Sequence, residues 1–256
     1  MVNLAGTLVL DDSWFATGTC PLLGWPDILG ADTSDGCHMP PLVRNLPLFP
    51  LNTVLFPNAT IPLHVFEERY RLMVQMCLDG DSIFGVVLIK SGSEVGEPAE
   101  PHSVGTVARI EDVNRMDNGR MLLRVKGAER FAILRITQQR SYIEANVQLL
   151  GDAADEEPVA SEVMDMVRTA TTRHVRLAMG LRGGWVREAK TPEDPAALSY
   201  FVGTLLQSEP NVKQALLEKQ STARRLQGEL ALMEEEEEKL RVLVAQQLTR
   251  RSFGAD

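Results

Sequence analysis

The side chains of this sequence that could do chemistry are a few cysteines, histidines and glutamates. Cys20, Cys37 and His38 are of metal-ligating types, and a zinc site would be the chemistry to expect of them. Structural zinc sites, however, draw four ligands from paired short spacings. No Cys-x-x-Cys pair is present, and the next histidine, His64, falls in a predicted strand. We therefore predict that the three residues are grouped by chance and that the protein holds no metal.

Three glutamates of the segment 90–103 could act as general acids or bases if burial raised their pKa values: Glu94, Glu97 and Glu100. The glycines and prolines of this segment are typical of an exposed loop, so we expect ordinary solvated carboxylates. His102 lies in the same loop and His174 on a predicted helix, and both are expected at the surface. The chain contains no G-x-x-x-x-G-K-[S/T] phosphate-binding loop. We predict no catalytic residue and no cofactor.

The composition is that of an ordinary globular protein with an acidic balance. The 256 residues are 44% hydrophobic and 24% charged, and the formal net charge is −9. This charge disfavours non-specific binding to nucleic acid or to an anionic membrane. No apolar run approaches the roughly 20 residues that span a bilayer. The N-terminus does not resemble a secretory signal, and three cysteines do not suggest a disulfide framework. We expect a cytoplasmic protein.

Two kinds of element are predicted between Asn45 and Asp81. Four prolines should exclude a long helix or a central strand from residues 46–62, so we expect short extended pieces joined by bends: Pro47, Pro50, Pro57 and Pro62. After Phe66, apolar residues recur at i, i+3, i+4 and i+7, which places them on one face of a helix: Tyr70, Met73, Val74 and Cys77.

Strand patterns follow, over residues 83–89, 104–113, 120–126, 131–136 and 142–150. Asp117-Asn118-Gly119 is a strong hairpin signal, because Asn-Gly readily takes the positive φ angles of a type I′ turn. Gly127 marks a bend or bulge. Three cations of the strand after the hairpin face one side and form a candidate partner-binding basic face: Arg120, Arg124 and Lys126. Such a face could hold an acidic peptide, RNA or an acidic neighbour within the chain.

The chain after an acidic linker at 151–158 is predicted to be helical. Periods and caps indicate helices over residues 159–179, from an N-cap at Thr191 to Leu206, from Pro210 to about residue 219, and from Ser221 or Thr222 to about residue 248. The last helix has a narrow apolar stripe, which predicts packing on one side and could also pair two copies in a dimer: Leu226, Leu230, Met233, Leu240 and Val244. Glu237 interrupts this stripe, so we expect weak packing there.

Several sequence blocks between Leu46 and Leu150 occur in the order known from one family: PLFPL, LFP, PLHVFEERYR, IFGVVLI, GTVARI, GRMLLRVKGAERFAILRI and YIEANVQLL. Together they resemble the Lon N-terminal domain, the PUA-like substrate-binding module at the front of Lon proteases. Stand-alone members often have proline where this chain has Glu68, and either residue suits an early helical position. The resemblance extends weakly to about residue 248, because a similar long helix occurs in Lon proteases.

The resemblance implies an α+β fold, with a PUA-like antiparallel β-barrel and one packed helix, followed by an all-helical bundle that ends in a long helix. It implies the barrel domain over 44–151 and the helical subdomain over 158–250. Residues 1–43 are expected to be a loosely ordered extension, because no period of 2 or 3.6 lasts beyond a few residues there, and a true start of the protein near the beginning of the resemblance is the alternative. Stand-alone bacterial members lack the ATPase and protease domains, and we expect the same here.

The function that the resemblance implies is non-catalytic binding of unfolded or partner polypeptides, with a separate protease as a candidate recipient. The corner formed by Leu55, Phe56 and Pro57 has two interpretations. Phe56 closes one end of the barrel, or the corner is an exposed apolar rim that receives a peptide. RNA binding by the basic face is an alternative, which the scarcity of aromatic residues for base stacking disfavours. A peptidase-related enzyme is a further alternative, for which no catalytic residue is predicted.

Overall fold

The computed structural model describes residues 41–94, 99–116, 119–139, 141–152 and 158–253. Met39–Asp256 form one compact unit, distinct from Met1–His38. The predicted N-terminal extension therefore lies almost wholly outside the described residues. None of the described helices has the length and hydropathy of a membrane-spanning segment.

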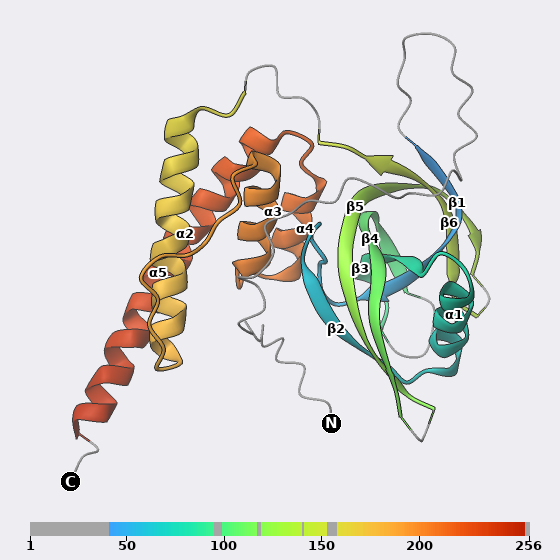
Figure 1. The fold of residues 1–256 in the computed structure, drawn as a ribbon, viewed down its shortest axis with the longest axis horizontal. Coiled ribbons are helices and arrows are strands. Elements are labelled where there is room, and N and C mark those ends of the chain that lie inside the picture. Colours follow the sequence, from blue (N-terminus) through green and yellow to red (C-terminus); the bar gives the residue numbers. More distant parts are fainter. Residues whose placement is uncertain (1–40, 95–98, 117–118, 140, 153–157, 254–256) are drawn as a thin grey trace. The chain divides into compact units, whose positions relative to one another are not determined.

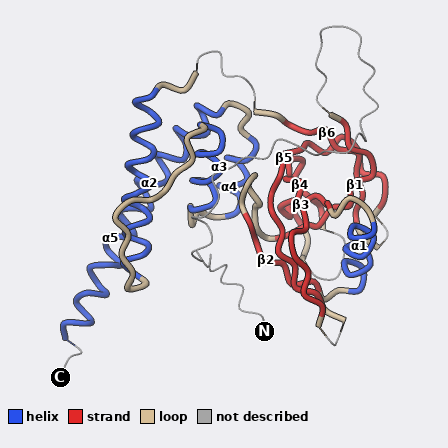
Figure 2. Tube along the Cα trace, viewed as in Figure 1, coloured by secondary structure: helices blue, strands red, loops and turns tan. Residues whose placement is uncertain are grey.

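The first part of the described chain is a six-stranded sheet with one helix (Figures 1 and 2). Its elements are β1 (Leu42–Leu51), β2 (Thr60–Val65), α1 (Glu68–Asp79), β3 (Ile83–Ser91), β4 (Glu100–Arg115), β5 (Met121–Gln138) and β6 (Ile143–Leu150). The strand order is β2-β5-β4-β3-β1-β6, and β5 also pairs with β6. This additional pairing joins β5, β4, β3, β1 and β6 into a closed ring.

The prediction of a wholly antiparallel sheet is wrong for one pair of strands. β1 and β3 are parallel, with Leu48 beside Gly85 and Leu51 beside Leu88. A parallel pair needs a long crossover connection, and β2 and α1 provide it in the chain. The other pairings are antiparallel.

The prediction that prolines exclude a central strand is also wrong. β1 contains Pro47 and Pro50, yet it has β3 on one side and β6 on the other. The reason lies in the register, since β6 pairs with residues 42–48 and β3 with residues 48–51. Each proline therefore has a partner strand on one side only, and its missing N–H can face the unpaired side.

β5 is one strand of 18 residues where the pattern predicted two. The predicted irregularity at Gly127 is confirmed. Thr106 pairs with Arg130 and Ala108 with Gly127, so β5 has one residue more than β4 over this stretch, which is a β-bulge. A Cβ on Gly127 would lie 2.2 Å from the carbonyl oxygen of Phe56, so only glycine permits this close approach of two backbones. β4 begins at Glu100, which makes the predicted loop at 90–103 shorter than expected.

α1 buries the predicted face, formed by Tyr70, Met73, Val74 and Cys77. The Tyr70 ring stacks on Phe49 of β1 at a centroid distance of 4.3 Å. This packing places the opposite face of α1 toward solvent.

The second part of the chain is helical: α2 (Ser161–Leu181), α3 (Pro195–Leu205), α4 (Pro210–Glu218) and α5 (Thr222–Phe253). The cap predicted at Thr191 is wrong. The carboxylate of Asp194 accepts a hydrogen bond of 2.7 Å from the backbone N–H of Ala197, with Pro195 in the first turn. The same cap-and-proline pattern simply recurs three residues further on. At α5, Ser221 accepts from the N–H of Arg224, which confirms that predicted cap.

The hydrophobic core is continuous from the strands to the helices. One buried cluster lies among the strands and includes Phe131. A second, larger cluster contains the buried face of α1, residues of the sheet, and residues of α2 to α5 such as Val167 and Leu226. The division of this unit into two domains at the linker stays a prediction.

Candidate polypeptide-binding surface

Exposed apolar side chains occur on α1, just before it, and on the β4–β5 hairpin that contacts it. Five large apolar side chains there are between 39% and 57% exposed: Phe66, Leu72, Met76, Met116 and Leu122. We refer to these five residues as the α1–hairpin surface. Exposed apolar side chains are normally scattered singly, whereas a group of them indicates an interaction site.

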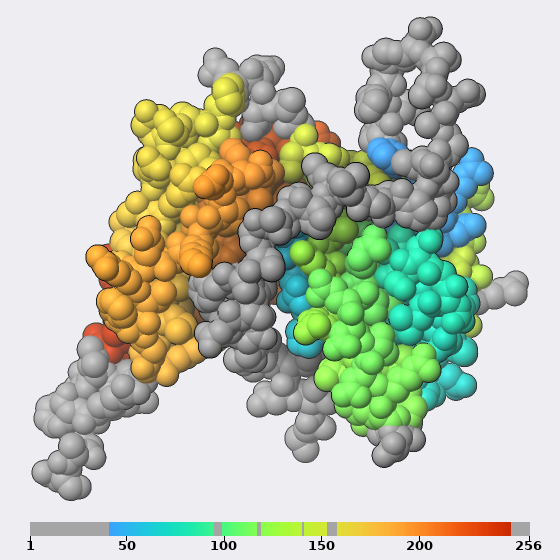
Figure 3. Space-filling view, viewed as in Figure 1, coloured from blue at the N-terminus to red at the C-terminus, as the bar shows by residue number. Residues whose placement is uncertain are grey.

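Two hydrogen bonds hold α1 against the hairpin. The guanidinium of Arg71 donates to the carbonyl oxygen of Gly119 at 3.2 Å, and that of Arg115 donates to the side-chain oxygen of Gln75 at 2.8 Å. Leu72 and Met76 directly follow Arg71 and Gln75 in sequence, so they lie about 100° further round the helix than the side that contacts the hairpin. Met116 directly follows Arg115 at the end of β4. In the space-filling view the atoms of α1 lie beside those of the hairpin (Figure 3).

Of the remaining two members, Leu122 lies on β5 and Phe66 lies between β2 and α1. Leu122 is exposed between two buried neighbours on β5, and it pairs with His64 of β2. The His64 ring lies 5.7 Å from the ring of Phe66, just before α1. On α1, the thioether of Met76 accepts a hydrogen bond of 3.2 Å from the hydroxyl of Tyr142. His64 thus connects Leu122 to Phe66, because it pairs with Leu122 and its ring lies near the Phe66 ring.

The corner predicted as a plug or a rim is buried. Leu55 and Phe56 are each 1% exposed, and Pro57 is buried as well. A Cβ on Gly203 of α3 would lie 2.8 Å from the Phe56 ring, so this ring packs directly against α3. The hydroxyl of Thr106 donates to the Leu55 carbonyl oxygen at 2.6 Å. The corner is a packing contact between strands and helices, and the exposed-rim interpretation does not describe this structure.

The predicted basic face is exposed, but its central arginine is partly neutralised. Arg124 lies 3.7 Å from Glu111 and 4.0 Å from Asp112, both on the neighbouring strand β4. Arg120, just before β5, and Lys126, on β5, are also exposed. Opposite charges on adjacent strands are an ordinary cross-strand pair, so Arg124 belongs to a mixed surface.

The predicted stripe on α5 is used inside the chain. Leu226, Met233 and Leu240 are at most 5% exposed, and Leu230 and Val244 are partly buried. The interruption at Glu237 is not a point of weak packing, because this side chain is buried. It pairs with Arg173 of α2 at 3.3 Å and with Arg241 at 2.7 Å.

A buried polar cluster that the sequence did not predict joins the strands to the helices. Oδ1 of Asp152, just after β6, accepts from Arg130 of β5 at 3.0 Å and from Arg225 of α5 at 2.9 Å. It also accepts from the Tyr200 hydroxyl of α3 at 2.6 Å. Both arginine side chains are 0% exposed. We call these four residues the Asp152 cluster. A basic strand residue does hold an acidic neighbour within the chain, as one interpretation of the basic face allowed, but the residue is Arg130.

Further bonds extend the Asp152 cluster. Arg130 donates to the carbonyl oxygens of Leu217 and Lys219 at the end of α4, at 2.9 and 2.8 Å. Arg225 donates to the Ser199 hydroxyl at 2.6 Å, and this hydroxyl donates to Glu229 at 2.9 Å. Burial raises the pKa of Glu229 to about 8, so this carboxyl is protonated at neutral pH.

The sequence matches the family of the ATP-dependent protease La (LON) substrate-binding domain over residues 45–235. The chain belongs to this family. Lon protease 2 of Myxococcus xanthus is 26% identical over 200 residues, which are 77% of this chain and 24% of that protein. Lon protease of Brevibacillus choshinensis is 25% identical over 199 residues, 77% of this chain and 26% of that protein. The chain thus spans about a quarter of the length of these curated relatives.

A solved Lon N-terminal domain protein from Xanthomonas campestris has the same fold. It superposes with a TM-score of 0.56 at 31% sequence identity, covering 74% of this chain and 98% of that one. The predicted membership of the Lon N-terminal family is therefore confirmed, together with its α+β class.

Two of the three glutamates of the segment 90–103 lie in the described residues, and each has a different partner. Glu94 accepts from the Asn52 amide at 3.1 Å, and burial raises its pKa. Glu100 accepts from Lys90 at 2.8 Å, and this bond lowers its pKa. Glu97 and the grouping of Cys20, Cys37 and His38 lie outside the described residues. Within the described ranges, no group of three or more histidine, cysteine, aspartate or glutamate side chains could hold a metal ion.

The surface positions predicted for two histidines need correction. His174 is 3% exposed, with Nε2 3.6 Å from a carboxylate oxygen of Glu236 on α5, and burial lowers its pKa. His102 lies on β4 and is half-buried, 3.5 Å from Glu218 of α4. In both cases a helix from elsewhere in the chain covers the imidazole.

Proposed function

We propose that this protein is a non-catalytic, polypeptide-binding member of the Lon substrate-binding family. In this proposal the α1–hairpin surface holds exposed apolar segments of client proteins. The observation that supports it most directly is that α1, the residue just before it and the hairpin that contacts it carry five half-exposed apolar side chains, in a chain whose family is described as substrate-binding.

The side chains of this surface suit clients of varied sequence. Met76 and Met116 are unbranched and polarizable, so they adapt to differently shaped apolar partners. Arg71 and Arg115 are already bonded to Gly119 and Gln75, and they form a polar border beside the apolar residues. A partly apolar centre with a polar border is the usual anatomy of a binding site.

The contribution of α1 to the free energy of binding follows from the exposed fractions of its two apolar side chains. Leu72 and Met76 are 57% and 54% exposed, so about half of each side chain remains to be buried by a client. Full burial of such a side chain contributes about 1.5–3 kcal/mol. The exposed halves together therefore contribute about 2 kcal/mol, which corresponds to roughly a thirtyfold change in Kd.

The test is binding of a permanently unfolded chain, reduced and carboxymethylated α-lactalbumin, measured by fluorescence anisotropy. We expect Leu72→Ser/Met76→Ser to weaken binding by roughly thirtyfold. The matched control is Val242→Ser/Leu243→Ser, on the exposed side of α5, where the two residues are 56% and 49% exposed. This control should change Kd by less than about threefold. Equal effects of the two pairs, or no binding by the unaltered protein, would exclude the proposal.

We also propose the finer description of the fold and its setting. The closed ring of strands corresponds to the PUA-like barrel, residues 44–151, and α2 to α5 to the helical bundle, residues 158–250. The protein would act in the cytoplasm and could pass clients to a separate protease. Crosslinking and mass spectrometry in cells would identify such a protease, and purified protein should not hydrolyse casein with or without ATP.

Two alternatives are less well supported. RNA binding by Arg120, Arg124 and Lys126 is disfavoured because carboxylates of β4 lie beside Arg124. Dimerisation through the α5 stripe would require side chains that are already buried within the chain. Light scattering should therefore report a mass that does not change when Leu240 is replaced by a polar residue and the protein remains folded.

A further inference from the structure

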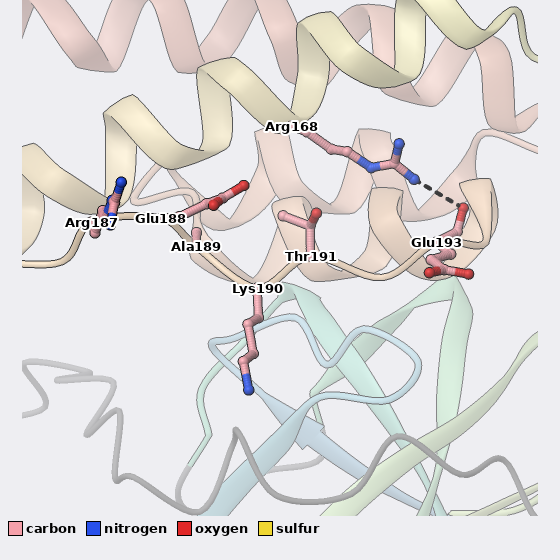
Figure 4. A pocket seen from close by; sticks show the side chains of 7 residues that line it. All are labelled: Arg168, Arg187, Glu188, Ala189, Lys190, Thr191 and Glu193. Atoms are coloured by element: carbon pink, nitrogen blue, oxygen red, sulfur yellow. Dashed lines mark hydrogen bonds between the residues drawn. The ribbon is translucent and has the colours of Figure 1, made fainter.

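A concave surface beside the segment between α2 and α3 carries charges of both signs (Figure 4). Its lining includes Arg187, Lys190, Glu188 and Glu193, and the guanidinium of Arg168 already donates to the carbonyl oxygen of Glu193 at 3.4 Å. Such a lining selects neither an anion nor a cation. The free edge of β2, in contrast, has a chemistry that closely fits one kind of ligand.

β2 is an edge strand of the sheet. It pairs with β5 on one side, and within the described residues no strand pairs with its other side. Edge strands are commonly protected from further pairing by charged side chains, especially lysine, or by proline. β2 has the sequence TIPLHV, without lysine, arginine, aspartate or glutamate. Protection by these charges is therefore missing, and only Pro62 interrupts the edge.

The register with β5 determines which backbone groups of β2 point away from it. The N–H of Gly127 donates to the carbonyl oxygen of Ala59 at 2.8 Å, and Thr60 lies opposite Lys126. In an antiparallel ladder this makes Thr60 and Lys126 a non-hydrogen-bonded pair, so alternate residues from Thr60 onward direct their backbone groups outward. These residues are Thr60, Pro62 and His64. They offer two N–H donors and three carbonyl acceptors, because proline has no N–H.

The outward residues lie at the surface. Pro62 and His64 are exposed, and Thr60 is half-buried. Their backbone groups repeat every two residues, at intervals of about 7 Å along the strand. The backbone of another extended chain has the same repeat, so it can satisfy these donors and acceptors in register.

We propose that β2 takes an extended segment of a client polypeptide as an additional strand. This inference rests on the proposed function, and it adds that the client is recognised through its backbone. The edge is continuous with the α1–hairpin surface, because His64 pairs with Leu122 and its ring lies 5.7 Å from that of Phe66. An added strand lies about 5 Å from β2, so its apolar side chains can contact Phe66. Backbone hydrogen bonds give affinity that does not depend on the client's sequence.

A second copy of this chain fits the edge less well. In an antiparallel pairing of two β2 strands centred on Pro62, neither proline can donate, so both hydrogen bonds of the central pair are lost. A client segment without proline keeps one of the two, because its own N–H donates to the Pro62 carbonyl oxygen. Pro62 therefore disfavours self-association and still allows a client strand.

The experiment compares two substitutions of His64 in the binding of reduced and carboxymethylated α-lactalbumin, measured by fluorescence anisotropy. His64→Pro removes the outward N–H together with the side chain, whereas His64→Ala removes the side chain alone. Neither removes a hydrogen bond to β5, because His64 and Leu122 form a non-hydrogen-bonded pair. We expect the proline variant to bind about fivefold more weakly than the alanine variant, which corresponds to one backbone hydrogen bond.

Amide hydrogen exchange of the unaltered protein, followed by NMR, needs no substitution. The N–H groups of Thr60 and His64 should exchange rapidly in the free protein and slow by about tenfold or more when α-lactalbumin is bound. Ile61 and Leu63 are the internal controls, because their N–H groups bond to β5 and should be protected in both states. This measurement decides the matter if His64→Pro does not fold.

Three outcomes would overturn this inference. The first is equal binding by folded His64→Pro and His64→Ala. The second is no added protection of Thr60 and His64 when the client is bound. The third is protection of both in the free protein with the mass of a dimer in light scattering, which would assign the edge to a second copy.

The client-binding proposal and the role of the β2 edge fail separately. If Leu72→Ser/Met76→Ser weakens binding but the two His64 variants bind equally, clients bind the α1–hairpin surface and β2 takes no part. If the unaltered protein does not bind α-lactalbumin, both proposals are wrong.

Discussion

Removal of the Asp152 carboxylate should destabilise the whole described unit. In Asp152→Ala, the guanidinium groups of Arg130 and Arg225 would stay buried and lose their shared anion, and the Tyr200 hydroxyl would lose its acceptor. Both arginines keep bonds to carbonyl or hydroxyl oxygens, so they are not left wholly unsatisfied.

The magnitude follows from burial. Breaking a buried charge pair by removing one partner costs about 3–5 kcal/mol. The Asp152 side chain itself is 27% exposed, which allows water to replace part of it and favours the lower end, about 3 kcal/mol. Asp152→Asn keeps an acceptor oxygen near the three donors and loses only the charge, so it should cost roughly half as much.

The assay is urea unfolding followed by circular dichroism, with stability taken from the midpoint at unchanged slope. The control is Asp165→Ala, which removes an exposed partner of Arg168 at 3.5 Å, where the aspartate side chain is 77% exposed. An exposed pair of this kind contributes about 0–1 kcal/mol. If Asp152→Ala and Asp165→Ala shift the midpoint equally, the Asp152 cluster does not join the strands to the helices as described.

Three further predictions concern packing and protonation. Gly203→Ala should destabilise the protein by about 1–3 kcal/mol in urea unfolding, because the added Cβ would lie 2.8 Å from the Phe56 ring. Gly180→Ala is its control, with no atom within 4 Å of the added carbon, and should be neutral or slightly stabilising. For Glu229, the folded pKa of about 8 exceeds the unfolded value near 4.5. The stability that this carboxyl contributes is therefore fully present below about pH 4.5 and is lost as the pH rises to about 8. Urea midpoints of Glu229→Gln should fall less over this range, and parallel profiles of the two proteins would contradict the buried, protonated carboxyl. Burial raises the pKa of the Cys77 thiol to about 11, so peptide mass spectrometry should find it unlabelled by iodoacetamide in the native protein, and rapid labelling would refute its burial.

The features that the sequence predicted well are those set by neighbours along the chain. The buried face of α1 follows from the helical period of Tyr70, Met73, Val74 and Cys77. The cap at Ser221 follows from the local chemistry of helix starts. The bulge at Gly127 was indicated by a glycine inside a strand pattern.

The features that it predicted poorly depend on contacts between distant segments. The prolines of β1 are tolerated only because β3 and β6 pair with different parts of that strand. His174 contacts Glu236 of α5, about 60 residues further along the chain. Its burial could have been predicted, because it lies seven residues after Val167 and four after Ala170 on the buried face of α2. The Asp152 cluster unites one residue of a strand, one of the predicted linker and two of separate predicted helices, and no spacing along the chain indicates that they meet.

The candidate surface could have been found from the sequence in part. Leu72 and Met76 are four residues apart on a helix whose buried face is already complete, which indicates a second apolar face. Met116 and Leu122 could not be added, because the position of the hairpin beside α1 depends on the bonds made by Arg71 and Arg115.

The contact between the Phe56 ring and Gly203 limits how this protein can be dissected or recombined. A fragment ending after β6 would leave an aromatic ring and the guanidinium of Arg130 uncovered on a sheet that is otherwise complete. Such a fragment should be prone to aggregation and poorly soluble. A stable truncated or fused protein should therefore keep the strands and the helices together, because the helices shield Phe56 and Arg130 of the sheet.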